Sequence, residues 1–364
     1  MSHPYANIPD LQRWSRMMAK RTSEQIDPVL PPSFKIEPDS RIVTAGSCFA
    51  QHVARYLRKH GRACFETEPA HPLLPPSVAE AFNYGVYSAR YGNIYTSRQL
   101  LQLWRRATGA LIPSDDRWDQ DGAFFDPFRP TIQPSGFRTL REYQEDRRQH
   151  FTAVRKAFGE MDVFVFTLGL TECWASCDDG AVYPLCPGVA AGRFDADQHR
   201  FLNLSVDEVV ADLHAFVAEV REINPGMKMI LTVSPVPLAA TAVPGHVLLA
   251  NSYSKAVLRV AAEKLTRLPD VYYFPAYEIV NAAGNEYFAA DRRSILEGGV
   301  LRVMALFFHH LFGADASTPT LTAGDDFLQR SQRVVDTLCD EQRLDADGRH
   351  TDPFDAGEQS HDRL

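Results

Sequence analysis

A strand, a tight turn and a helix are predicted together by one short stretch, Ile42-Val43-Thr44-Ala45-Gly46-Ser47-Cys48-Phe49-Ala50. Its first residues are apolar or β-branched, as in a buried strand, and the glycine that follows them is typical of a turn. Apolar side chains then recur at helical spacing, at positions 49, 53 and 57. Ser47 is therefore expected at the carboxyl end of the strand and near the start of the helix, where backbone N–H groups have no partner within the helix.

Two roles of Ser47 follow from this local pattern. Its hydroxyl can cap the helix by accepting a hydrogen bond from the backbone, as serine often does. Alternatively, the hydroxyl can attack a substrate while the N–H groups of the helix start stabilise the developing negative charge. Its neighbour Cys48 is either a small buried hydrophobic side chain or a reactive thiol.

Strands and helices alternate along most of the chain. Further strands are predicted at residues 63–66, 162–168, 229–233 and 271–274. Helices are predicted at residues 49–60, 140–158, 206–223, 252–265, 300–312 and 325–339. The run at 162–168 is almost entirely apolar, as in a strand buried on both faces of a parallel sheet. This order predicts an α/β fold with a doubly wound, mostly parallel sheet in a three-layer αβα sandwich.

The pattern divides the chain into three parts. Residues 1–40 are a leader, with an amphipathic pattern at 11–21 followed by several prolines, which is expected to pack on the domain. Residues 41–312 form the α/β domain, and residues 313–364 add a helix and a polar tail, expected to be disordered beyond Leu344.

Residues 69–140 are too many for a simple crossover between parallel strands and are expected to be an insertion. They contain Asn83-Tyr84-Gly85-Val86-Tyr87 and Arg90-Tyr91-Gly92-Asn93-Ile94-Tyr95. Glycine among tyrosines predicts either a loop that approaches a ligand such as a sugar, or a loop that packs on its own domain. Residues 173–204 are expected to form a small hairpin over the strand ends.

Composition excludes several classes of function. Hydrophobic residues make up 45% and charged residues 23% of the chain, as in soluble globular proteins, and no apolar run is long enough for a membrane span. The net charge of −8 argues against a nucleic-acid partner. The N-terminus lacks the apolar core of a secretory signal, so a cytoplasmic location is expected. Six cysteines without a Cys-x-x-Cys pair or a suitably spaced histidine predict reduced thiols, no metal and no cofactor.

Gly46-Ser47-Cys48-Phe49-Ala50 resembles the signature of the GSCFA domain family, whose members are similar to the SGNH/GDSL hydrolases. The resemblance covers roughly residues 41–312. It implies an SGNH- or flavodoxin-like sheet and a serine-dependent acyl-ester hydrolase or acyltransferase. The partner would be a small-molecule or glycan ester, either carbohydrate-like or otherwise polar, and Ser47 would be the nucleophile.

The resemblance also implies how the site would hold an oxyanion. SGNH enzymes use an N–H of the nucleophile's turn, a glycine from a second block and the asparagine of a Gly-x-Asn-Asp block. Here Cys48 would supply an N–H, and either Gly85 or Gly92 would correspond to the second block. Gly169-Leu170-Thr171-Glu172 resembles the third block, with Thr171 in place of asparagine as the donor and Glu172 in place of aspartate, orienting the site.

The general base is where the sequence departs from this pattern. The Asp-x-x-His of SGNH enzymes corresponds here to Asp291-Arg292-Arg293-Ser294, so the histidine is missing. Without a base the rate falls by about 10²–10⁴-fold. Asp291 is expected at the same sheet edge as Ser47, and a histidine is expected to approach from elsewhere, His246 before His52. The Pro-Gly turn before His246 also fits a surface position.

A binding protein is the alternative to an enzyme. A pocket without its base would recognise a glycan or an acylated ligand and would not turn it over. The retained Gly-Ser and Gly-x-Thr-Glu turns favour the enzyme, whereas the missing histidine favours the binding protein.

Overall fold

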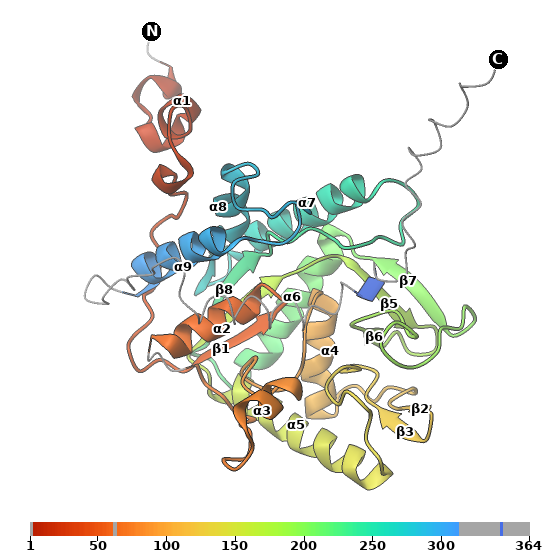
Figure 1. The fold of residues 1–364 in the computed structure, drawn as a ribbon. Coiled ribbons are helices and arrows are strands. Elements are labelled where there is room, and N and C mark those ends of the chain that lie inside the picture. The colour runs from red at the N-terminus through yellow and green to blue at the C-terminus, as the bar shows by residue number, and fades with distance from the viewer. Residues whose placement is uncertain (1–2, 61–63, 313–342, 345–364) are drawn as a thin grey trace, which may run out of the picture.

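The computed structural model describes residues 3–60, 64–312 and 343–344 (Figure 1). At its centre is a parallel sheet of four strands, in the order β1 (Ile42–Gly46), β4 (Val163–Leu168), β8 (Lys228–Val233) and β9 (Val271–Tyr273). On the other side of β1 from β4, the described part of the strand predicted at 63–66, residues 64–66, forms one parallel bridge between Cys64 and Ile42. The prediction of an α/β fold with a mostly parallel sheet is confirmed.

Helices pack on both faces of the sheet. Strand residues such as Val43 and Phe164 join a cluster with α4 (Ser97–Thr108), α5 (Leu140–Glu160), α6 (Val206–Arg221) and α7 (Val247–Leu265). The residues next to them, such as Ile42 and Val163, join a second cluster with α2 (Ala50–Lys59), α8 (Ala276–Ala282) and α9 (Glu297–Leu311). The strands are therefore covered on both sides, which explains the apolar run at 162–168.

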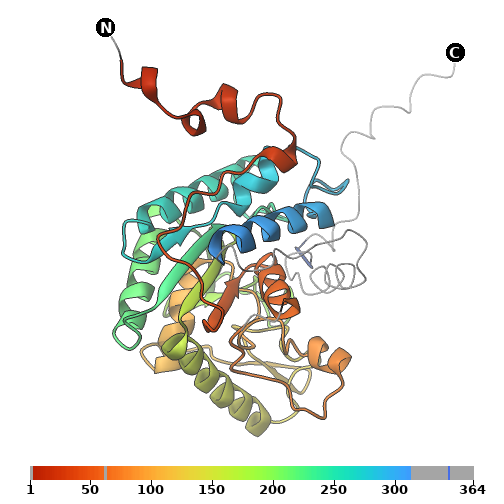
Figure 2. The same cartoon turned by 90° about the vertical axis from the view of Figure 1, so that its left-hand side faces the viewer.

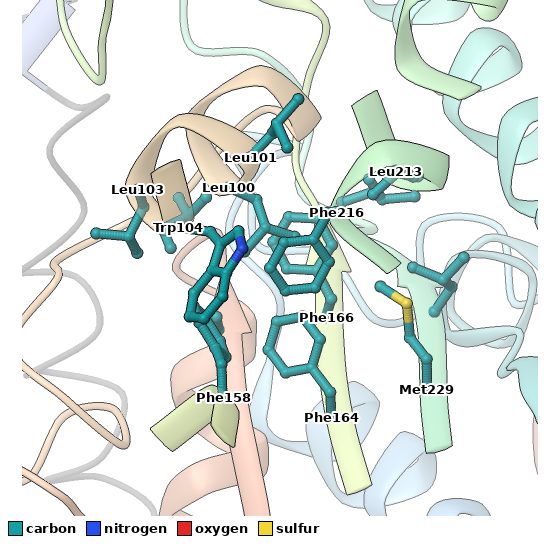
Figure 3. Close-up of a cluster of buried hydrophobic side chains, with 14 of the residues drawn as sticks. Leu100, Leu101, Leu103, Trp104, Phe158, Phe164, Phe166, Leu213, Phe216 and Met229 are labelled. Carbon is teal, nitrogen blue, oxygen red and sulfur yellow. The ribbon is translucent and has the colours of Figure 1, made fainter. Parts of the chain in front are cut away.

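Figure 3 shows part of the first cluster, where aromatic side chains from four elements meet. Phe158 of α5 contacts Trp104, Phe164 and Phe216 edge to face, with ring centroids 5.3–6.0 Å apart. Such pairs contribute about 0.5–1.5 kcal/mol each beyond the area that they bury. The cluster fixes α4, α5 and α6 against β4, and it thereby holds the carboxyl end of β4 in place.

Residues 69–140 carry α3 (Pro76–Ala81), α4 and a hairpin of β2 (Trp118–Gln120) and β3 (Ala123–Phe125). A buried ion network fastens this segment to α5. Arg129 lies 2.8 Å from Asp126 and 2.7 Å from Asp146 of α5, and Arg90 lies 2.7 Å from the same Asp146. The segment is thus an integral part of the domain.

A second, smaller sheet begins directly after the turn that follows β4. Its order is β6 (Val182–Tyr183), β5 (Glu172–Ser176) and β7 (His199–Asn203), all antiparallel. The predicted hairpin over the strand ends is therefore present, with one more strand than expected. Its central strand β5 begins at Glu172, next to the strand end that the sequence marked as a site.

The N-terminal leader packs on the domain only in its second half. Residues 3–25 contain three short 3₁₀ helices and α1 (Trp14–Met17). None of their side chains is buried, and Trp14 is 80% exposed. Figure 1 and Figure 2 both show this segment projecting from the α/β domain. Packing begins only at Ile26, followed by Val29 and Phe34. Because its apolar residues find no partner surface, nothing offsets the cost of ordering a longer helix.

None of the helices in the described residues combines the length and the apolar character that crossing a membrane requires. The predicted helix at 325–339 and almost all of the polar tail lie outside the described residues.

Candidate functional site

The turn after β1 is held tightly against β4. Gly46 has φ +140°, and a Cβ there would lie 2.4 Å from the carbonyl oxygen of Thr167, so only glycine fits. The N–H of Ser47 donates to the same Thr167 oxygen over 3.2 Å, and the N–H of Ala50 donates to the carbonyl of Ser47 over 2.8 Å. These contacts fix Ser47 between the end of β1 and the start of α2.

The hydroxyl of Ser47 is buried and uncommitted. Ser47 is 3% exposed, and its Oγ has no hydrogen-bond partner within the described residues. Helix α2 has no side-chain cap, so the capping interpretation of Ser47 is wrong. A buried polar group without a partner costs about 1–3 kcal/mol. Such a group is explained if a ligand or a reaction uses it.

The turn after β4 lies directly against Ser47. A Cβ on Gly169 would lie 3.0 Å from the Cβ of Ser47 and 3.1 Å from the carbonyl oxygen of Tyr95. That Tyr95 oxygen accepts hydrogen bonds from the N–H groups of Gly169 and Leu170, at 3.1 and 3.2 Å. The site therefore joins the β1 end, the β4 end and residue 95 of the insertion. Since Cys64 lies on the other side of β1, this is the point where the strand order reverses, and open α/β sheets bind ligands there.

Ser47 lines a small cavity of about 10 Å³, space for about one water molecule. Three of its lining residues, Tyr95, Leu170 and Leu238, also line a much larger pocket of about 320 Å³. Trp174 of β5 and Phe201 of β7 belong to the wall of that pocket. The cavity at Ser47 thus adjoins a mainly apolar pocket, with which it shares part of its wall.

Helix α7 supports the site from behind with three polar side chains. Nζ of Lys255 donates to the carbonyl of Gly169 over 2.8 Å, and Ser254 accepts a hydrogen bond from the N–H of Thr171 over 3.0 Å. Asn251 accepts one from the N–H of Leu238 over 3.2 Å. The sequence analysis predicted no role in the site for these three residues, because a lysine or a serine in a helix is usually exposed. Their burial became visible only with the fold.

Thr171 and Glu172 hold the walls of the site together. The Thr171 hydroxyl donates to Asn203 over 2.6 Å and its N–H donates to Ser254, so both donors are already used. The carboxylate of Glu172 lines the larger pocket and accepts hydrogen bonds from the Thr241 hydroxyl and the Ala242 N–H, at 2.6 and 3.1 Å. Thr171 thus joins β7 and α7 at the site, and neither of its donors is left for the predicted oxyanion contact.

The tyrosine- and glycine-rich loop packs on its own domain. Tyr87 donates to Asn93 over 2.6 Å and to the carbonyl of Ser47 over 3.1 Å, and its ring is buried. Neither Gly85 nor Gly92 is among the residues that line the two cavities, and the carbonyl of Gly85 accepts a hydrogen bond from Arg58. The insertion instead contributes Tyr95 to the site.

The structure places the predicted bases differently. His246 is exposed and caps α7, its Nδ1 accepting a hydrogen bond from the N–H of Leu248 over 3.1 Å, so it occupies a surface position. Asp291 accepts hydrogen bonds from the N–H of Arg293 and from both the N–H and the hydroxyl of Ser294, at 2.9, 3.0 and 2.7 Å. Asp291 is exposed, and the slight burial that it has acts to raise its pKa, but these donors outweigh that effect and lower the pKa. Arg293 in the same turn donates to the carbonyl of Pro237, which lines the cavity of Ser47.

His52 is a buried histidine on α2. It is 4% exposed, its Nδ1 has no partner within the described residues, and its ring lies against Phe49. Burial, and then the charge of Arg55, lowers the pKa of His52 to about 3. The imidazole is therefore neutral at neutral pH, and it belongs to the helix that begins at the site.

Cys48 is buried, packs against Val236 and lines the small cavity beside Ser47. No disulfide joins any of the five cysteines at positions that the structure describes, as the prediction of reduced thiols requires. Within the same residues, no three side chains of histidine, cysteine, aspartate or glutamate gather into a possible metal site.

A sequence model of the GSCFA family matches residues 41–307, from the strand before Ser47 to the last described helix. The predicted resemblance is thereby confirmed over most of the chain. Comparison with curated proteins gives no match.

Proposed function

Because the chain belongs to the GSCFA family, we propose that it is a serine-dependent acyl-ester hydrolase or acyltransferase with an SGNH-like three-layer fold. Its substrate is an ester of a carbohydrate-like or other polar alcohol. One observation carries the proposal. The hydroxyl of Ser47, which is buried and has no hydrogen-bond partner among the described residues, lies where a parallel sheet reverses its strand order, and it faces a cavity that adjoins an apolar pocket.

The proposed chemistry starts with attack of the Ser47 oxygen on the ester carbonyl. The Ser47 proton passes to the carboxylate of Asp291 and then to the departing alcohol, which leaves an acyl-enzyme. Water or a second alcohol, deprotonated by the same carboxylate, then takes the acyl group and returns Ser47. Asp291 is supported in this role because its turn is tied to Pro237 at the cavity wall.

Two donors are proposed for the oxyanion. The N–H of Cys48 belongs to the turn that opens α2, where the helix dipole favours negative charge. The hydroxyl of Ser234, which lines the same small cavity and is 1% exposed, takes the place that the sequence assigned to Thr171. Lys255 supports the Gly169 turn between them.

A binding protein is the second candidate, and one observation favours it. The carboxylate of Asp291 is engaged by its own turn and its pKa is lowered, which makes it a weaker base. If no base reaches Ser47, the pocket holds an acylated ligand or a glycan without cleaving it.

Kinetics of Ser47→Ala separate the two candidates. The enzyme loses at least about 10³-fold in kcat for p-nitrophenyl esters, while its affinity for the product acid is retained. Ser252→Ala, an exposed serine on α7, is the matched control and keeps full activity. Wild-type protein that binds the acid but hydrolyses no ester would contradict the enzyme and leave the binding protein.

A further inference from the structure

We infer that the acyl group of the substrate is apolar and of medium size, a chain of about eight carbons or an aromatic ring, and is not acetyl. The inference rests on the proposed function. It names the part of the ester that enters the larger pocket.

The cavity at Ser47 and the larger pocket share part of their walls. Tyr95, Leu170 and Leu238 line both the small cavity at Ser47 and the larger pocket. An acyl carbon bonded to Ser47 therefore begins in the small cavity. The rest of its chain extends past these three residues into the larger space.

The walls of the pocket suit hydrocarbon. Trp174 packs against Phe201 and Phe194 with ring centroids 5.5 and 5.1 Å apart, which makes one wall aromatic and stiff. Cys173 and Cys186 line the pocket as neutral thiols, because burial raises the pKa of Cys173 to about 12 and that of Cys186 to about 11.

The single charged side chain among the described lining residues is Glu172, and it is already engaged. Its two carboxylate oxygens accept hydrogen bonds from Thr241 and Ala242, at 2.6 and 3.1 Å. The Thr241 hydroxyl is used in the same contact. A sugar in this pocket would therefore bury hydroxyl groups that find few hydrogen-bond partners. An apolar acyl chain has no polar group that needs such a partner.

The size of the pocket sets the size of the acyl group. A cavity of about 150 Å³ lined by apolar side chains holds a benzene molecule. The pocket here, at about 320 Å³, is roughly twice as large. An acetyl group would leave most of it unfilled, and each buried methylene improves binding by about fourfold.

Hydrolysis of p-nitrophenyl esters from C2 to C12 by the full chain tests the inference. We expect kcat/KM to rise by about fourfold per methylene up to about C8 and then to level off. An acetyl ester that is hydrolysed as fast as the octanoyl ester would overturn the inference and leave the proposed function standing.

Binding measured without turnover tests the inference even if the protein hydrolyses no ester. Calorimetry with Ser47→Ala should detect binding of octanoate or cinnamate and no binding of acetate. Ala240→Phe, which fills the pocket, should weaken the binding of octanoate at least tenfold. Val260→Phe on the exposed side of α7 is the control and changes nothing. If no ester is hydrolysed but octanoate binds in this way, the proposed function fails and the pocket assignment survives. If neither octanoate nor cinnamate binds, the inference is overturned.

Discussion

The ammonium group of Lys255 lies 2.8 Å from the carbonyl oxygen of Gly169, the residue against which Ser47 packs. Lys255 is 3% exposed, so this contact places a buried polar head group behind the candidate nucleophile. The shape of the site therefore depends on α7 as well as on the two strand ends.

Replacing Lys255 with methionine should destabilise the protein by about 1.5–3 kcal/mol, because it removes a charge-assisted hydrogen bond and leaves a buried carbonyl with one partner fewer. Urea unfolding measures the loss. Lys264→Met is the matched control, because Lys264 is 44% exposed and pairs with an exposed aspartate, and it should cost less than about 0.5 kcal/mol. Equal losses in the two variants would contradict the role given to Lys255.

Two glycines at the site should tolerate alanine differently. Gly46→Ala meets backbone at 2.4 Å with φ +140°, so we expect a loss above about 2 kcal/mol in the free energy of unfolding. Gly169→Ala crowds Ser47 at 3.0 Å and should reduce turnover or ligand affinity about tenfold, with a smaller effect on stability. Gly226→Ala, which meets nothing within 4 Å, is the control for both. A Gly169→Ala protein with unchanged activity and ligand binding would contradict the proximity of this turn to the reacting atoms.

His52 should make stability depend on pH. Its pKa is lowered from 6.5 to about 3 in the folded protein, so the unfolded chain binds more protons between these values. The contribution of the neutral ring to the free energy of unfolding is fully present above about pH 6.5. Below that pH it falls by up to about 1.4 kcal/mol per pH unit. The pKa values of Glu68 and Asp126 are lowered to about 2, so those groups add their own losses only nearer pH 4. Burial also lowers the pKa of His150, so that ring contributes to the loss of stability in the same pH range. Urea titrations from pH 7 to 5 should therefore show a slope that His52→Gln reduces, and an unchanged slope in that variant would contradict the assignment.

Asp126 should be critical for the stability of the inserted segment, residues 69–140. Burial acts to raise its pKa, but the charges of Arg129 and Arg106 outweigh it and lower the pKa to about 2. Asp126→Asn removes the counter-charge that lies 3.8 Å from the buried Arg106 and leaves the buried Arg129 with Asp146 alone, and we expect a loss of about 3–5 kcal/mol. Asp119→Asn, in an exposed pair with Arg117, is the control and should cost below about 1 kcal/mol. Thermal or urea unfolding of the two variants tests this contrast.

Much of the fold could be predicted because its signals are local. The apolar run at 162–168 gave β4, and the helix predicted at 206–223 matches α6 within two residues. Helix α7 begins five residues earlier than predicted, because His246 caps it. Helix α8 was missed, since its seven residues are too few for a clear period.

The site was only partly predictable, because its geometry depends on contacts between distant segments. Ser47, Cys48 and Gly169 meet as expected, since the carboxyl ends of neighbouring parallel strands share one edge. Lys255 and Tyr95 were missed as site residues because nothing in the local sequence indicates that they reach that edge. His246 was favoured as the base from its position after a strand, yet its ring caps a helix instead.

Labelling with a fluorophosphonate tests the central claim most directly, because this probe forms a covalent bond with an activated serine and leaves ordinary serines unlabelled. We predict one adduct per chain, located by peptide mass spectrometry on Ser47, absent from Ser47→Ala and unchanged in Ser252→Ala. A folded protein that takes up no label, or takes it up on a residue other than Ser47, would contradict the assignment of Ser47 as the nucleophile.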